Sequence, residues 1–251
     1  MVRITANNIK EGLNLLGLDV GSIVLVHSSL SRFGFVEGGA DAVIDALVAT
    51  VGMSGTVMVP TLTGNETLSS ENPPTFDPED TPSWTGVITE TFRKRSDSIR
   101  SLHPTHSIAA IGADAKALTK DHFNSITPCD KLSPYGKLAQ QTNAYILLLG
   151  VDHSVNTTLH HIEEMVGVDY HMQEGLVRCT MILGSEKVQR YYMLHKYGAD
   201  RQFNIIDPLL TERGIQMITR IGNAEIRLVK AQQMVKLVAK CLLADQRFLC
   251  V

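Results

Sequence analysis

The stretch that decides the fold is Leu147-Leu148-Leu149-Gly150-Val151-Asp152-His153-Ser154-Val155-Asn156-Thr157-Thr158-Leu159-His160-His161-Ile162-Glu163-Glu164. It begins inside an apolar run from Tyr145 to Leu149, which is typical of a strand buried on both faces. Gly150 ends the run, and Asn156 follows a short polar loop as a residue that can cap a helix. The spacing predicts that this helix faces the core through Leu159, Ile162 and Val166.

Three polar side chains leave the predicted helix one turn after its start: His160, Glu163 and Glu164. They lie just beyond the carboxyl end of a strand, where open α/β sheets place their sites. Taken alone, His160 and Glu163 are equally consistent with a surface ion pair at i, i+3, worth roughly 0.2–0.5 kcal/mol. The choice between these readings depends on the rest of the chain.

Composition narrows the class of protein. The 251 residues are 44% hydrophobic and 20% charged, which is ordinary for a globular protein and excludes disorder. A net charge of −3 supplies no overall basic field, so we expect neither a nucleic-acid nor a membrane partner. The four cysteines form no CxxC pair and indicate reduced thiols in a cytoplasmic protein. A homodimer is left open.

A second loop has the composition of an anion-binding turn. The apolar strand Ile23–Val26 runs into the Ser- and Gly-containing stretch 27–34, and a helix is predicted over 41–51. Backbone N–H groups and hydroxyls between a strand and a helix N-terminus can hold phosphate. The pattern is neither GxGxxG nor GxxxxGK[ST]. An ordinary βα turn is the alternative reading.

The remaining elements indicate an α/β fold, namely a central mixed, mostly parallel sheet flanked by helices, with an antiparallel hairpin insertion. We expect one domain over residues 1–251. Further helices are predicted over 5–16, 83–95, 113–122, 135–140 and 207–214, with one closing helix after residue 230. The hairpin is predicted from 176–183 and 187–193, and a strand over 221–228. The aperiodic stretch 61–82 is either a substrate wall or a surface excursion.

Several loops together resemble the aminoglycoside 3-N-acetyltransferase family, which is known for antibiotic resistance. The matching stretches follow the family's order along nearly the whole chain. They are His27-Ser28-Ser29-Leu30-Ser31-Arg32-Phe33-Gly34, Gly55-Thr56-Val57-Met58-Val59-Pro60-Thr61, Arg100-Ser101-Leu102-His103-Pro104-Thr105-His106-Ser107, Ser133-Pro134, Asn156-Thr157-Thr158-Leu159-His160 with Glu163, and Ile221-Gly222-Asn223-Ala224-Glu225-Ile226-Arg227-Leu228.

The resemblance implies acetyl-coenzyme A as cosubstrate, a small-molecule primary amine as acceptor, and no metal. It implies that pantetheine and phosphates are held by His27, Ser28, Ser29, Leu30, Phe33, Gly34, Thr105 and Ser107. It also implies that His160 is the general base. An amine is mostly protonated near neutral pH, and an imidazole is well matched to accept that proton. Glu163, if bonded to the ring, would support the imidazolium.

The chain departs from the family at the position of a further carboxylate expected from beyond the hairpin. His195 stands there, with Asp200 a little beyond, and we expect both to contact the acceptor together with Asp152. A histidine does not stabilise an imidazolium as a carboxylate does. Because this region also mixes charges of both signs, we expect polycationic aminoglycosides to be poor substrates.

Two rival functions remain open at this level. A metal-dependent hydrolase could use the His/Glu cluster at 153–164, although adjacent histidines on a helix point apart and the spacing is not HExxH. A coenzyme A-binding protein without catalysis would need the loop at 27–34 but not His160.

Overall fold

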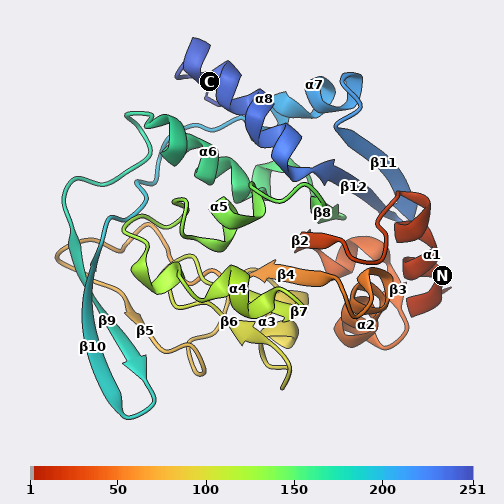
Figure 1. Cartoon of the computed structure of the whole chain (residues 1–251), viewed down its shortest axis with the longest axis horizontal. Coiled ribbons are helices and arrows are strands. Elements are labelled where there is room, and N and C mark those ends of the chain that lie inside the picture. Colours follow the sequence, from red (N-terminus) through yellow and green to blue (C-terminus); the bar gives the residue numbers. More distant parts are fainter. Residues whose placement is uncertain (1–2, 251) are drawn as a thin grey trace.

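A seven-stranded sheet forms the centre of the molecule, which we describe from a computed structural model covering residues 3–250 (Figure 1). Its strand order is β11-β12-β8-β2-β4-β7-β6. In that order the strands are Gln216–Ile221, Ala224–Lys230, Ala144–Leu149, Ile23–Ser28, Thr56–Pro60, Ile108–Gly112 and Ile99–Arg100. Three almost wholly buried strands, β8, β2 and β4, lie at the middle of the sheet because their side chains are mostly apolar on both faces.

The expected α/β fold with a mixed sheet is confirmed, but fewer strands are parallel than the sequence led us to expect. Within the described sheet, β2 pairs in parallel with β4 and β8, whereas the other neighbouring strands are antiparallel. The parallel centre places the carboxyl ends of β2 and β8 side by side, with Ser28 opposite Leu149. Both loops singled out in the sequence therefore leave the same edge of the sheet.

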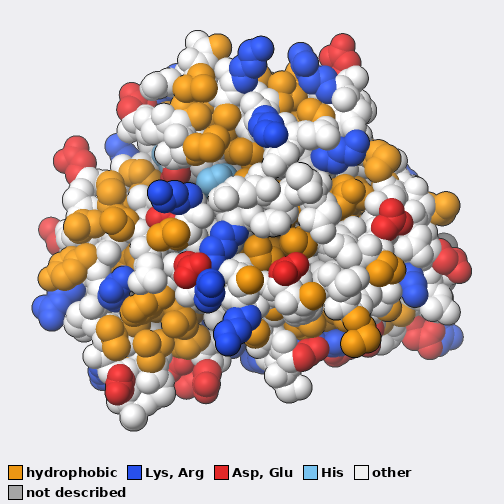
Figure 2. All heavy atoms as spheres, in the orientation of Figure 1, with side chains coloured by type: hydrophobic (Ala, Val, Ile, Leu, Met, Phe, Trp, Pro, Cys, Tyr) orange, Lys and Arg blue, Asp and Glu red, His pale blue; other side chains and the backbone are white. Residues whose placement is uncertain are grey.

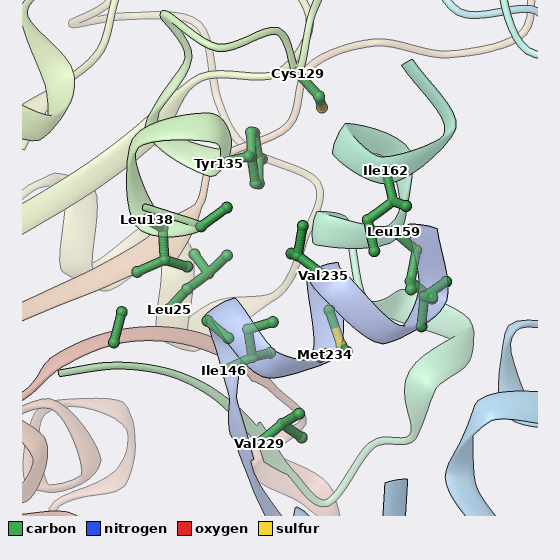
Figure 3. Packing of buried hydrophobic residues seen from close by; sticks show 14 of the residues in the cluster. Leu25, Cys129, Tyr135, Leu138, Ile146, Leu159, Ile162, Val229, Met234 and Val235 are labelled. Atoms are coloured by element: carbon green, nitrogen blue, oxygen red, sulfur yellow. The ribbon is translucent and has the colours of Figure 1, made fainter. Parts of the chain in front are cut away.

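Helices cover both faces of the sheet (Figure 1). One face packs against α1 (Ala6–Leu15), α2 (Gly39–Val51) and α3 (Val87–Arg93). The other packs against α4 (Ala115–Thr119), α5 (Pro134–Leu138), α6 (Thr158–Val166) and α8 (Ala231–Ala244). Figure 3 shows this second core, where Tyr135 of α5, Ile162 of α6 and Val235 of α8 point toward one another. No helix among the described residues has both the length and the apolar character needed to cross a membrane.

The predicted hairpin is confirmed and projects from one side of the molecule (Figure 1). It consists of β9 (Val177–Leu183) and β10 (Glu186–Tyr192), and β5 (Thr75–Phe76) adds a parallel third strand. Part of the aperiodic stretch 61–82 thus packs on the hairpin. A small core of its own, including Phe76, Cys179 and Tyr192, holds this unit together.

Short elements complete the chain, and one predicted strand begins later than expected. The pair β1 (Arg3–Ile4) and β3 (Phe35–Val36), the helix α7 (Ile206–Glu212) and the 3-10 turns η1 (Leu30–Phe33), η2 (His122–Asn124), η3 (His153–Val155) and η4 (Phe203–Ile205) fill the connections. The strand predicted over 221–228 is confirmed from Ala224 onward as part of β12, but Ile221 ends β11, and Gly222-Asn223 form the turn between the two strands. Gly222 adopts a φ of 60°, which permits this tight reversal.

Candidate active site

Asn156 sets the start of the helix that carries the predicted catalytic residues. Its Oδ1 accepts a hydrogen bond from the Thr158 N–H at 3.2 Å, and its Nδ2 donates to His153 Nδ1 at 3.2 Å. His153 donates in turn to Gln216 Oε1 at 2.7 Å, which ties the loop to β11. Since Leu159 and Ile162 of α6 are fully buried (Figure 3), the face that bears His160 and Glu163 is held in one orientation.

His160 and Glu163 form a direct pair. The His160 Nδ1–H donates to Glu163 Oε2 at 2.7 Å, and the Glu163 side chain is fully buried. Arg201 donates from Nε to Glu163 Oε1 at 2.8 Å and from Nη2 to His171 Nδ1 at 2.8 Å. Although burial raises the pKa of Glu163, hydrogen bonding to His160 and the nearby positive charges lower it to about 2. Glu163 is therefore a carboxylate across the physiological range.

Three further imidazoles surround His160. The His171 ring stacks on it with 5.0 Å between centroids, and the His195 ring lies 5.1 Å away. His106 contacts His195 edge to face at 4.4 Å. Burial is the largest cause that lowers the pKa of His171 to about 3 and the pKa values of His106 and His195 well below the ordinary one. These three rings are consequently neutral hydrogen-bonding groups.

Glu164, the neighbour of Glu163, is in a different electrostatic state. It accepts hydrogen bonds from the Thr127 hydroxyl at 2.5 Å and the Cys129 N–H at 2.9 Å, and His195 Nε2 lies 2.7 Å from its Oε1. Burial, reinforced by the charges of Asp130 and Glu163, raises its pKa to about 8 despite those hydrogen bonds. Two adjacent carboxyl groups on one helix thus differ in protonation at neutral pH.

Two cavities meet at His160. The first, of about 290 Å³, is lined by His27 and Ser28 at the end of β2, by Val155, Asn156 and Thr157, and by His160 and Phe203 among others. The second, of about 240 Å³, adjoins the first, with which it shares Leu62, Trp84, Ser154, His160 and Phe203, and its other lining residues are His106, His171, His195, Lys196, Tyr197 and Arg201. Two reactants in adjoining cavities could therefore both reach one imidazole.

A third, more polar cavity of about 470 Å³ continues from the first. It shares Val151, Ser154 and Val155 with it, and its wall also carries Ser29, Arg32 and Arg227. Arg227 is paired with Asp207 and Glu225. Arg32 and Arg227 are cationic groups that could bind an anionic ligand end, and the carboxylates of Asp152 and Glu225 belong to the same wall.

Comparison with known proteins identifies the family. The family model described as aminoglycoside 3-N-acetyltransferase matches residues 25–243. The chain belongs to this family.

Individual relatives agree with that assignment. Aminoglycoside N(3)-acetyltransferase IV of Salmonella is 32% identical over 223 residues, which are 88% of this chain and 80% of that protein. The solved apoenzyme of aminoglycoside acetyltransferase AAC(3)-IVa superposes with a TM-score of 0.84 at 29% identity, covering 99% of this chain and 92% of its own. A binary complex of AAC-IIIb with CoASH gives 0.81 at 25% identity, covering 96% and 97%. The protein is thus an acyltransferase of the aminoglycoside 3-N-acetyltransferase family.

The predicted donor residues of this acetyltransferase separate into two groups. His27 and Ser28 line the first cavity, and Ser29 lines the third. Leu30 to Gly34 form the turn beneath them, in which Phe33 is buried. The Ser107 hydroxyl is bonded to Thr61, and the Thr105 hydroxyl to His106 Nδ1, so neither reaches these cavities.

The predicted acceptor residues also separate. His195 lies in the second cavity beside His160. Asp152 caps η3 by accepting from the Ser154 N–H at 3.0 Å, and it lines the third cavity instead. Asp200 is exposed and lines neither cavity at His160. Of the three, only His195 is placed to touch a molecule in the second cavity.

A larger cavity, about 920 Å³, is lined by residues of α5, α6 and α8, with Glu163 and Glu164 among them. Its walls are mainly apolar, with Met165, Val168 and Val235 among them, and Figure 2 shows hydrophobic side chains gathered over α6 and α8 around a histidine. His161 contributes to this wall and donates through Nδ1 to the Cys129 carbonyl. Because His160 is not part of it, size does not locate the chemistry in this fold.

The histidines do not form a ready metal centre. The cluster predicted at 153–164 is divided, since His153 bonds Gln216 and His161 bonds the Cys129 carbonyl. Ring nitrogens of His160, His171 and His195 do lie within 4.8 Å of one another. However, zinc needs lone pairs that converge at about 2.0–2.1 Å. The His160 and His171 rings are stacked at 17°, so their in-plane lone pairs run side by side. This geometry does not favour a hydrolase.

Sequence reasoning missed two residues that fix the pair. Arg201 and His171 lie 38 and 8 residues beyond Glu163 in the chain, in segments without periodic pattern. A bridge between Met172 and His195 and the bond from the Lys196 N–H to the His171 carbonyl bring their segments together. No local signal in the sequence reports such a contact.

Proposed function

We propose that this protein transfers the acetyl group of acetyl-coenzyme A to a primary amine, the kind of acceptor group that the names of its aminoglycoside N-acetyltransferase relatives imply, with His160 as general base. The observation that carries this proposal is the position of His160, whose ring borders two cavities while its Nδ1 is held by an ionised, fully buried carboxylate. An acetyl transfer needs one group that reaches both donor and acceptor, and this ring is in that position.

The first cavity suits the pantetheine arm of the donor. His27 Nε2 and Ser28 Oγ are buried there without a hydrogen-bond partner in the described chain. Unpaired buried polar atoms are rare in folded proteins, and a ligand with amide groups, such as pantetheine, would satisfy both. Ser29 and Arg32 of the third cavity would then face its phosphates. Burial lowers the pKa of His27 to about 3, so it acts as a neutral hydrogen-bonding group.

The reaction follows from this arrangement. The Nδ1–H of His160 faces Glu163, so the lone pair is on Nε2. Nε2 accepts the proton that the amine loses as its nitrogen bonds to the acetyl carbon. The bond from that carbon to sulfur breaks, and the coenzyme A thiolate leaves and is protonated. Glu163 stabilises the imidazolium while Arg201 holds the carboxylate in place.

The test is His160→Asn. A positioned general base contributes typically about 10²–10⁴-fold in rate, so we expect kcat with any accepted amine to fall by that factor. Donor binding should persist, because His160 contributes only one wall of the donor cavity. Thermal melting with coenzyme A reports this, since a ligand at a hundredfold excess over Kd stabilises by about 2.7 kcal/mol.

His161→Asn is the matched control, because this neighbouring ring faces away from both cavities. Its activity should stay near that of the wild type. Near-full activity of His160→Asn would contradict the mechanism. The absence of a thermal shift by coenzyme A in the wild type would contradict the donor assignment, and it would equally contradict the rival reading of a coenzyme A-binding protein without catalysis.

A further inference from the structure

The second cavity carries a positive rather than a negative wall. None of its lining residues is Asp or Glu, whereas Lys196 and Arg201 both belong to it. The imidazoles of His106, His171 and His195 complete the polar part. Leu62, Trp84 and Phe203 supply the apolar part.

The carboxylates that lie nearby are already engaged. Glu163 Oε1 accepts from Arg201 and Oε2 from His160. Glu164 is bonded to Thr127, to the Cys129 N–H and to His195 behind the cavity wall. Glu66 is an exposed carboxylate near Tyr197. Burial is the main cause that raises the pKa of Tyr197, and the negative charge of Glu66 raises it further. Glu66 is outside the lining, so the cavity itself offers an incoming cation no free carboxylate.

Arg201 and Lys196 differ in how far neighbouring groups pair with their charges. Arg201 faces Glu163 through Nε and His171 through Nη2, which leaves Nη1 for another partner. Lys196 is exposed and forms no ion pair within the part of the chain that the structure describes. The Lys196 N–H donates to the His171 carbonyl at 2.7 Å, so its backbone is fixed although its ammonium is not.

The volume of the second cavity also favours a small acceptor. Its volume of about 240 Å³ is below the roughly 300–1,000 Å³ of pockets that bury a drug-sized ligand. A polycationic amine of several rings would have to place further ammonium groups against Lys196 and Arg201, where like charges repel. A compact amine with one negative group would pair with them instead.

We propose that the natural acceptor is a small primary amine carrying a carboxylate or a phosphate, which Lys196 and Arg201 bind while the amine faces His160. This inference rests on the proposed acetyl transfer and narrows its acceptor. The basis is charge complementarity in the cavity that His160 borders.

The experiment compares kcat/KM for matched amines. Glucosamine 6-phosphate is set beside glucosamine for the phosphate arm, β-alanine beside its amide for the carboxylate arm, and a gentamicin-type aminoglycoside serves as the polycation. We expect at least one anionic amine to exceed its neutral partner by about tenfold or more, and the aminoglycoside to fall below it. The arm with the larger ratio of kcat/KM, anionic amine over neutral partner, identifies the preferred anionic group as phosphate or carboxylate. A wild-type preference for the neutral members or the polycation would overturn the proposal.

Lys196→Glu should reverse the order by lowering kcat/KM for the anionic amine about tenfold or more and raising it for the aminoglycoside. Lys240→Glu makes the same charge change on an exposed position of α8 and should alter neither. If the ratio of kcat/KM for the anionic amine to kcat/KM for the aminoglycoside is unchanged in Lys196→Glu, Lys196 does not bind the anionic group and the proposal is wrong.

A binding measurement separates this inference from the proposed function. Thermal melting with each amine alone requires no turnover, and the anionic member should raise the melting temperature of the wild type but not of Lys196→Glu. If no amine is acetylated but this difference holds, the transfer is wrong and the anion site stands. If amines are acetylated without any such difference, the transfer stands and the anion site is wrong.

Discussion

At the scale of single residues, Glu163 and Glu164 show how surroundings alone give two identical side chains different pKa values. Both are buried on α6, yet Glu163 contacts His160 and Arg201, while Glu164 contacts neutral hydrogen-bond donors and His195. The pKa of Glu163 is lowered to about 2 and that of Glu164 is raised to about 8. A positive neighbour offsets the cost of burying charge in the first case only.

Replacing each glutamate by glutamine tests this division. Glu163→Gln removes a charge that supports the imidazolium, and we expect kcat at pH 7 to fall by about 10²–10⁴-fold, as for comparable carboxylate–histidine pairs. Glu164→Gln resembles the protonated form that already prevails below pH 8, so its kcat should stay within about threefold of the wild type. Steady-state kinetics of the two purified variants measures this difference in kcat. Equal losses in both would mean that Glu164 also carries charge during turnover.

The sequence located His160 and Glu163 because a helix pattern fixes the spacing of side chains on one face. It did not locate Arg201 or His171. The contact of Arg201 with Glu163 closes a loop of 38 residues that contains the β9–β10 hairpin, and His171 lies in an aperiodic segment 8 residues after Glu163. Ser107 is the opposite case, because its contact with the donor stays a prediction. Its motif is present, but its hydroxyl is bonded to Thr61 inside the protein.

At the scale of elements, the link between β8 and α6 positions His160 and Glu163. Gly150 ends the strand with a φ of 68°, and Asn156 caps the helix six residues later. Asn156 is completely buried, so its amide cannot be replaced by water without opening the loop.

Asn156→Ala should lower both stability and activity. It removes the cap of α6 and leaves His153 Nδ1 without its donor, together costing about 1–3 kcal/mol. Because His160 lies one turn from this cap, kcat should fall as well. Thr5→Ala removes the cap of α1 far from the cavities, where Thr5 accepts from the Asn8 N–H at 3.3 Å. That control should lose about 1 kcal/mol and keep its kcat. Urea unfolding and kinetics on both variants check the pair, and an unchanged kcat in Asn156→Ala would contradict the positioning role.

Most elements were predictable because their boundaries carry local chemistry. Thr5 caps α1 and Ser133 caps α5, as their positions before apolar periodic stretches indicate. The start of the strand expected over 221–228 was placed three residues too early, because the turn signal Gly222-Asn223 stands between residues that all suit a strand. The strand directions were not predictable, since pairing partners such as β4 and β7 are set by tertiary packing rather than by either sequence alone.

At the scale of the whole molecule, histidine burial is the unusual feature. The chain has nine histidines, and in eight of them burial is the largest cause of a lowered pKa: His27, His103, His106, His122, His153, His161, His171 and His195. Only part of this set lines the cavities at His160. Folding therefore keeps many imidazoles neutral that would be protonated in the unfolded chain at mildly acidic pH.

This predicts that the protein loses stability steeply below pH 6.5. A histidine whose pKa is lowered on folding contributes its full stability above the unfolded value of 6.5, and that stability is lost as pH falls toward the folded value, about 3 for His27 and His171 and about 4 for His122. Each such group costs about 1.4 kcal/mol per pH unit in this window.

Glu163 has the same sign but acts lower, between 4.5 and about 2, whereas the raised pKa of Glu164 opposes the histidines between pH 4.5 and about 8. Eight imidazoles outweigh one carboxyl group. Urea unfolding at pH 7.5, 6.5 and 5.5 should therefore show the free energy of unfolding fall by at least about 3 kcal/mol over the last step. His122 lies outside the cavities at His160, and its pKa is about 4 in the folded protein. His122→Asn should therefore reduce the number of protons taken up on unfolding at pH 5.5 by about one. A free energy that stays constant down to pH 5.5 would show that the buried imidazoles are already protonated in the folded protein.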